Sequence, residues 1–102
     1  MVAFLFTDVE GSTRLWEAHP AETGRAVAVH DDILREAIAS HEGHVFSTGG
    51  DAFCAAFSSV RAAVEAGVAA QLGLRGLVVN DEPVRVRMAV HVARQQLARR
   101  QR

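Results

Sequence analysis

Residues 4–13 read FLFTDVEGST, an apolar run that ends in an acid, a glycine and two hydroxyl side chains. The five consecutive apolar residues 2–6 are too few for a free-standing helix and are typical of a strand covered on both faces. Asp8 would then lie at the C-terminal tip of that strand. A carboxylate at such a place can hold the divalent cation that accompanies a phosphate.

The residues after Asp8 predict the start of a short helix. Gly11 is followed by Ser12 and Thr13, either of which is a plausible N-cap, and helix formers occupy residues 14–18. Backbone N–H groups at a helix start attract anions. The stretch therefore predicts a site for metal and polyphosphate, but an ordinary strand-to-helix turn with an acidic cap has the same pattern.

Length and composition indicate one small globular domain. The 102 residues are 49% hydrophobic and 23% charged, and no apolar run approaches the ~20 residues of a membrane span. A basic segment followed by a signal-like stretch is missing at the N-terminus, which argues against export, so we expect a cytoplasmic protein with no membrane partner. Cys54 is the only cysteine, which excludes an internal disulfide and argues against a cysteine-based metal cluster.

All eleven basic residues are arginine. A Walker-type phosphate loop, a Schiff base and a lysine general base each need an ammonium group that this chain lacks. Residues 1–92 carry seven arginines against twelve acids, a net charge of −5, whereas residues 93–102 carry +4. We predict a domain over 1–92 and a basic tail over 93–102, and the acidic domain disfavours nucleic acid as a partner.

The rest of the chain alternates between helical and strand patterns. A helix is predicted over residues 21–41, and two short strand patterns, 44–48 and 52–57, flank the turn Gly49-Gly50-Asp51. Ser58 or Ser59 would cap a second long helix, whose predicted buried face carries Val60, Ala63, Val64, Gly67, Val68, Gln71 and Leu72. Residues 84–91 alternate apolar and polar side chains, as a half-buried strand does.

This order of elements, βααββαβ, predicts an α+β fold of the ferredoxin-like split βαβ type, an antiparallel sheet with helices on one face. Right-handed crossovers place the first two strands parallel to each other, with the third between them. The start of the third strand, at Asp51, would lie beside the end of the first, at Asp8. Two such carboxylates can hold two Mg²⁺ or Mn²⁺ ions, which would neutralise a triphosphate and activate a hydroxyl for attack on phosphorus. The alternative is that each acid only caps a turn or a helix.

With both acids in place, the chain resembles the class III adenylate/guanylate cyclase catalytic domain. FTDVEGSTRLWE is similar to the first-strand motif of that family, and HDDILREAIASHEGHVFSTGGDAFCAAF to its second helix and metal-binding hairpin. The resemblance implies that Asp8 and Asp51 hold two metal ions with help from the Val9 carbonyl. It also implies that Gly11, Ser12 and Thr13 surround the triphosphate of ATP or GTP.

The resemblance further implies a reaction and an assembly. The ribose 3′-hydroxyl would attack the α-phosphorus and give a cyclic nucleotide and pyrophosphate. Family members work as head-to-tail dimers, in which each shared site takes metals from one protomer and base recognition from the other. A homodimer, or a heterodimer with a full cyclase domain, is therefore expected.

Three positions depart from the family pattern. Ser47 replaces the lysine that helps select the base, and Ala89 replaces a glycine. After His91 the family continues with a second base-contacting residue and with the asparagine and arginine that stabilise the transition state, whereas this chain ends with VARQQLARRQR. Because each lost donor typically costs about 10²–10³ in rate, we predict a metal-binding half of a cyclase domain with little or no activity alone.

Other interpretations remain open at this point. Gly49 to Phe53 reads GGDAF, similar to the GGDEF signature of diguanylate cyclases but with Ala52 in place of the catalytic acid. A dimerisation or regulatory module without activity, paired with an intact cyclase, fits the same motifs. A dehalogenase-like phosphatase would need a lysine, which is absent. A zinc site at His30, His41 and His44 would need ligands from a helix, its end and a strand.

Overall fold

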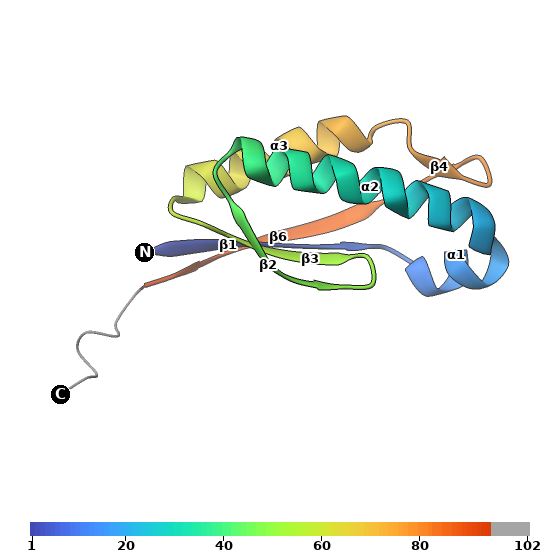
Figure 1. Ribbon diagram of the computed structural model, residues 1–102, viewed down its shortest axis with the longest axis horizontal. Helices are drawn as coiled ribbons and strands as arrows, with labels where there is room; N and C mark the ends of the chain where they lie inside the picture. Colours follow the sequence, from blue (N-terminus) through green and yellow to red (C-terminus); the bar gives the residue numbers. More distant parts are fainter. Residues whose placement is uncertain (95–102) are drawn as a thin grey trace.

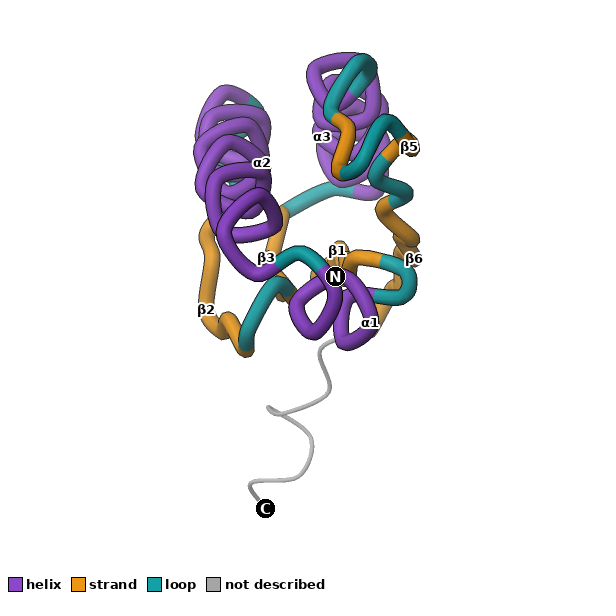
Figure 2. Tube along the Cα trace, turned by 90° about the vertical axis from the view of Figure 1, so that its right-hand side faces the viewer, coloured by secondary structure: helices purple, strands orange, loops and turns teal. Residues whose placement is uncertain are grey.

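Two long helices lie side by side on one face of a four-stranded sheet in the computed structural model, which describes residues 1–94 (Figures 1 and 2). The elements are β1 (Val2–Val9), α1 (Ser12–Ala18), α2 (Pro20–Ser40), β2 (His44–Gly49), β3 (Ala52–Phe57), α3 (Val60–Leu74), β4 (Val78–Val79), β5 (Glu82–Pro83) and β6 (Val86–Ala93). The sheet order is β2-β3-β1-β6, with every neighbouring pair antiparallel. The ferredoxin-like α+β prediction is therefore confirmed.

β1 is the central strand, and its side chains alternate between two very different environments. Ala3, Leu5, Thr7 and Val9 are buried beneath the helices. The residues between them lie on the open face of the sheet, where Phe6 is 39% exposed. The expectation of a strand covered on both faces is therefore wrong for the described residues, because both long helices lie on the same face.

The hairpin between β2 and β3 forms as predicted. Gly50 has a φ of 60°, the left-handed conformation that glycine adopts without strain in a tight turn. Gly43, just before β2, allows the chain to approach the core closely, since a Cβ there would collide with the Phe57 ring and come within 2.8 Å of Ile38 Cγ2. The next cap is also as predicted: the Ser59 hydroxyl accepts a hydrogen bond from the Ala62 N–H at 3.1 Å.

The start of α1 differs from prediction. Gly11, not Ser12 or Thr13, occupies the N-cap position, with φ 69°, and no side chain caps the helix. A left-handed residue directly before the first helical turn needs glycine, and it places the two hydroxyl residues inside the helix. The Thr23 hydroxyl of α2 instead holds α1, donating a hydrogen bond to the Leu15 carbonyl at 2.9 Å.

α3 buries only two of the residues that its periodicity predicts for the buried face, Ala63 and Gly67. The buried residues are small, Ala63, Ala66, Gly67 and Ala70, together with Leu74. Val60, Val64, Val68 and Leu72 are 37–56% exposed. Both stripes repeat with helical spacing, and the small residues face the sheet because they let the helix approach closely.

The segment between α3 and the last strand contains a small hairpin that the sequence analysis does not predict. Asn80 and Asp81, both at positive φ, join β4 to β5 in a small separate hairpin. The predicted strand over residues 84–91 appears as β6, two residues later at each end. Most of the predicted basic tail, residues 95–102, lies outside the described residues. None of the described helices is long and apolar enough to cross a membrane.

Replacing Gly43 with alanine tests the close approach beside Phe57. The added methyl has no space between Phe57 and Ile38, so we expect Gly43→Ala to lower the free energy of unfolding by about 1–3 kcal/mol. Gly49→Ala is the matched control, because a Cβ at Gly49 meets no atom within 4 Å. Urea denaturation of both variants measures the difference, and equal stabilities would show that the β2 entrance is loosely packed.

Candidate functional site

The end of β1 lies beside the start of β3, as the topology predicts. Antiparallel pairing runs from Ala3–Phe57 to Thr7–Phe53. Continued by two residues, the same register would set Asp8 opposite Ala52 and Val9 opposite Asp51. Asp8 and Asp51, from distant parts of the sequence, therefore lie near the same end of the sheet.

Asp8 makes a two-pronged ion pair with Arg87 of β6. The Arg87 Nε and Nη2 atoms each donate a hydrogen bond of 2.9 Å to one carboxylate oxygen of Asp8. The two residues are direct cross-strand partners. The pKa of Arg87 is raised above its ordinary value, chiefly by the hydrogen bond and charge of Asp8, with smaller contributions from Glu10 and Asp51. Arg87 is thus the cation that pairs with Asp8 and lies near the other acids at this end of the sheet.

Sequence reasoning did not select Arg87. The strand pattern assigns it to the polar side of an alternating segment, together with Arg85, and nothing local separates the two arginines. The available signal was topological: the last strand of a split βαβ fold lies next to the first. Pairing β6 to β1 in antiparallel register brings one of the two arginines opposite Asp8.

Asp51 is in a different environment from Asp8. It is only 8% exposed, and its Oδ2 atom has no hydrogen-bond partner among the described residues. Burying an unpaired carboxylate oxygen is costly unless a cation or a donor binds it. The arrangement fits a divalent cation, since Asp51 offers a free oxygen beside the strand end that carries Asp8.

The donors gathered here are few. Within residues 1–94 no three side chains of His, Cys, Asp or Glu are grouped to hold a metal. A cation held by Asp8 and Asp51 would therefore need further oxygens, from the Val9 carbonyl or from a ligand. The same finding goes against the zinc interpretation. His30 is fully buried with its Nδ1 2.9 Å from Asp31 Oδ1, and His41 Nδ1 bonds the Ala37 carbonyl at 2.7 Å.

A cavity of about 340 Å³ opens on the sheet beside the ion pair, within the usual size of small-molecule sites. Its floor contains Cys54, Phe6 and Ala89, which form one cross-strand row because Phe6 pairs with both neighbours. Asp8 and Arg87 also line it. The site thus combines an apolar floor with a charged rim.

The remaining predicted residues lie around this cavity at different depths. Ser47 is exposed on β2 and pairs with Cys54, which extends the floor row toward the sheet edge. Gly11, the N-cap of α1, and Thr13, in its first turn, are both exposed. Ser12 is half-buried and lines a small space between α1 and α2 together with Leu15.

Comparison with known proteins adds a family to this geometry. The family model for the adenylate and guanylate cyclase catalytic domain matches residues 1–94. A receptor-type adenylate cyclase of Trypanosoma congolense is 42% identical over 88 residues, covering 82% of this chain and 12% of the relative. An adenylate cyclase of Schizosaccharomyces pombe is 40% identical over 63 residues, 62% of this chain and 4% of the relative.

Solved structures show the same fold. A structure from a study of Trypanosoma brucei adenylate cyclases in their monomeric state superposes with a TM-score of 0.81 at 29% identity, covering 88% of this chain and 55% of that one. A bacterial light-regulated adenylyl cyclase gives a TM-score of 0.75 at 21% identity, with 87% and 51% covered. The chain spans about half the length of these structures.

Asp51→Asn separates a ligand-binding carboxylate from a structural cap. Because the buried Oδ2 has no partner, replacing the charge by a neutral amide should keep or raise metal-free stability, by up to about 2 kcal/mol. Asp32→Asn, at an exposed position of α2, should change it by less than about 0.5 kcal/mol. Thermal unfolding in EDTA measures both. A clear loss in Asp51→Asn would mean that the carboxylate mainly stabilises the hairpin turn.

Proposed function

Because the family model covers residues 1–94, the chain belongs to the adenylate and guanylate cyclase catalytic domain family, and we propose that its site binds a divalent-metal complex of a nucleoside triphosphate. The observation that carries the proposal is the unpartnered buried oxygen of Asp51, in the turn next to the strand end that carries Asp8. The proposed reaction converts the nucleotide to its 3′,5′-cyclic form and pyrophosphate.

We propose that Asp8 and Asp51, with the Val9 carbonyl, hold two Mg²⁺ or Mn²⁺ ions. The ions would supply positive charge to the phosphates and favour ionisation of the attacking ribose hydroxyl. Asp8 must share or release Arg87 to accept a cation, since the guanidinium occupies both of its oxygens. Asp51 needs no such exchange, because its Oδ2 is free.

The phosphates would lie between the Gly11 connection and Arg87. Gly11 has no side chain to block close approach, and Ser12 and Thr13 follow it with hydroxyl and N–H donors. A released Arg87 would be the cation nearest to the metal carboxylates and could pair with a phosphate oxygen in the same two-pronged way. The apolar row at Phe6 offers a surface for the uncharged part of a ligand.

ATP is the proposed nucleotide. The curated relatives compared above are named adenylate cyclases, and they are 40–42% identical over the matched residues. Ser47, at the proposed base-selecting position, can donate or accept a hydrogen bond but brings no charge. Discrimination against GTP would therefore rest on hydrogen bonding alone at this position.

We propose that turnover by residues 1–102 alone is weak. Within the described residues, Arg87 is the only cation that contacts the site carboxylates, and it is already paired with Asp8. Charge that develops on the phosphates would find few fixed donors, and each missing donor typically costs about 10²–10³ in rate. Pairing with a second cyclase domain, as a homodimer or with an intact cyclase, is the proposed route to a complete site.

A regulatory role is the second candidate, and the small donor set at the site favours it. Within residues 1–94 no group of three His, Cys, Asp or Glu side chains could hold a metal. Asp8 and Asp51 could then supply a metal half-site to an intact cyclase, in the cytoplasm. The diguanylate cyclase interpretation has less support. The family model that matches residues 1–94 is that of adenylate and guanylate cyclases. In addition, Ala52 replaces the acid that follows the aspartate in the GGDEF signature.

Binding of Mn²⁺ with a non-hydrolysable ATP analogue tests the site directly. We expect Asp8→Asn and Asp51→Asn each to weaken binding by about tenfold or more, because each removes a charged ligand worth at least about 1.4 kcal/mol. Asp32→Asn should bind like the native chain, as the residue is exposed on α2. Isothermal titration calorimetry measures all four proteins. Equal affinities in all of them would remove both acids from the site.

Product formation tests the proposed chemistry separately from binding. Purified protein with Mn²⁺ and ATP should form cyclic AMP slowly, at least about 10²-fold below a complete cyclase domain, and more slowly still with GTP. Asp51→Asn should abolish even this rate. Rapid turnover by the native chain alone would contradict the proposed shortage of phosphate donors.

A further inference from the structure

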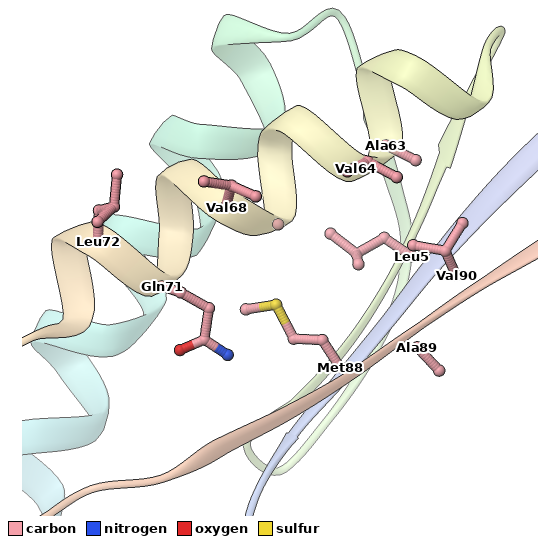
Figure 3. Close-up of a pocket in the computed structure, with 10 residues that line it drawn as sticks. Leu5, Ala63, Val64, Val68, Gln71, Leu72, Met88, Ala89 and Val90 are labelled. Atoms are coloured by element: carbon pink, nitrogen blue, oxygen red, sulfur yellow. The ribbon is translucent and has the colours of Figure 1, made fainter.

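Two spaces beside the long helices differ in their chemistry. An apolar groove of about 320 Å³ lies between α3 and β6, where Val68 of the helix and Met88 of the strand border it (Figure 3). Among the described residues that line this groove, Gln71 carries the only polar side chain, and its Nε2 donates a hydrogen bond to the Val86 carbonyl at 2.8 Å. The lining of the groove therefore identifies no ligand.

A smaller space lies inside the domain, where α1 and α2 meet β1 and β4. Its volume is about 10 Å³, close to the space that one water molecule needs. Most of its lining side chains are apolar, and the polar ones are Ser12 of α1 with Thr23 and His30 of α2. We call this space the α1–α2 cavity.

His30 brings an unsatisfied nitrogen atom to the α1–α2 cavity. Its ring is 0% exposed, and its Nδ1 lies 2.9 Å from Asp31 Oδ1. Because an ionised carboxylate only accepts hydrogen bonds, we assign the proton to Nδ1, and Nε2 of the neutral ring is then an acceptor. This Nε2 is buried and has no hydrogen-bond partner among the described residues. A buried acceptor of this kind needs a donor.

The other two polar residues can complete the hydrogen bonds of a single water molecule. The Thr23 hydroxyl already donates its hydrogen to the Leu15 carbonyl at 2.9 Å, so it can only accept another bond. The Ser12 hydroxyl is half-buried and can donate. A water that donates to His30 Nε2 and to Thr23, and accepts from Ser12, makes three hydrogen bonds, the usual number for buried water.

A metal ion fits this cavity less well than water does. Within residues 1–94 no three side chains of His, Cys, Asp or Glu are grouped to hold a metal. The remaining lining residues are aliphatic, among them Val27 and Val79. A neutral molecule that both donates and accepts hydrogen bonds suits this mixture of groups.

We propose that the α1–α2 cavity binds one water molecule, and that through this water His30 is a positioning residue for the start of α1. The inference rests on the proposed function, in which Gly11, Ser12 and Thr13 surround the phosphates. The water ties the Ser12 hydroxyl to α2, so the first turn of α1 keeps one orientation before the nucleotide arrives.

α1 depends on attachments of this kind. None of its seven residues is buried, and no side chain caps its N-terminus. The bond from Thr23 to Leu15 holds the middle of the helix, whereas the proposed water holds its first residue. Val9, the last residue of β1, lines the same cavity, so the water lies next to the strand end that carries the proposed metal ligands. Groups that support a binding site from behind commonly change ligand affinity about 10–100-fold when they are removed.

A double-mutant cycle tests the shared water. Calorimetry with Mn²⁺ and a non-hydrolysable ATP analogue should show about tenfold weaker binding for His30→Leu, which removes the acceptor. Ser12→Ala should also weaken binding, and the double variant should bind no more weakly than the weaker single variant, because both changes remove the same water. His30→Gln keeps a polar group near the Nε2 position and should bind within about twofold of the native chain. His41→Leu, at the C-cap of α2, is the matched control and should bind like the native chain.

Two measurements without nucleotide separate this inference from the proposed function. Amides of residues 15–18 should exchange hydrogen at least about fivefold faster in His30→Leu than in the native chain. NMR should show Overhauser contacts between a bound water and the methyl groups of Val27 and Val79 in the native chain and in His30→Gln, and none in His30→Leu. Circular dichroism checks that all variants keep the native helix content.

The two ideas fail in different ways. A native chain that does not bind the analogue would contradict the proposed function, while amide exchange and the water contacts would still decide the role of His30. Missing water contacts in the native chain, equal exchange in His30→Leu, or effects of His30→Leu and Ser12→Ala that multiply would each overturn the inference. If His30→Leu loses helix content, the water contacts of the native chain and of His30→Gln decide the question.

Discussion

The antiparallel pairing of β1 with both β3 and β6 is the constraint on which the site depends. One neighbour brings the turn with Asp51 to the end of β1, and the other brings Arg87 directly opposite Asp8. A shift of one residue in either register would turn the paired side chain to the opposite face of the sheet. The burial of Leu5 and Val9 under the helices opposes such a shift, so the apolar side of β1 fixes the geometry of its polar side.

Once this register is set, the site contains more negative than positive charge. The charges of Asp8, Glu10 and Asp51 all raise the pKa of Arg87. Among the described residues, Arg87 is the cation that forms an ion pair at this site, with Asp8. The two metal-site candidates differ in how this imbalance is met. Asp8 is half-exposed and paired, whereas Asp51 is buried and keeps one oxygen unsatisfied. An arriving cation would therefore relieve a desolvation cost at Asp51 and compete with an ion pair at Asp8.

The features predicted from sequence are those set by local signals and by topology. Apolar runs, the Gly-Gly turn and the Ser59 cap identify β1, the β2–β3 hairpin and α3, and the rules of strand connection then bring Asp8 and Asp51 together. The missed features depend on tertiary contacts. Gly11 replaces a hydroxyl cap because the chain needs a left-handed residue there, and Arg87 differs from Arg85 only through its partner on β1. Residue spacing alone predicts neither the glycine N-cap nor the pairing of Arg87 with Asp8.

The burial of α3 shows how packing in the core creates a surface property. Hydrophobic periodicity predicts one buried face that includes Ala63 and Gly67 together with valines and Leu72. The structure buries Ala63, Ala66 and Ala70, because small residues let the helix lie close to β1. This choice pushes Val64 and Val68 to the rim, next to the uncovered edge of β6. The tight helix–sheet contact that holds β1 in place thus also produces the apolar groove, at a distance from the acids that the same strand presents.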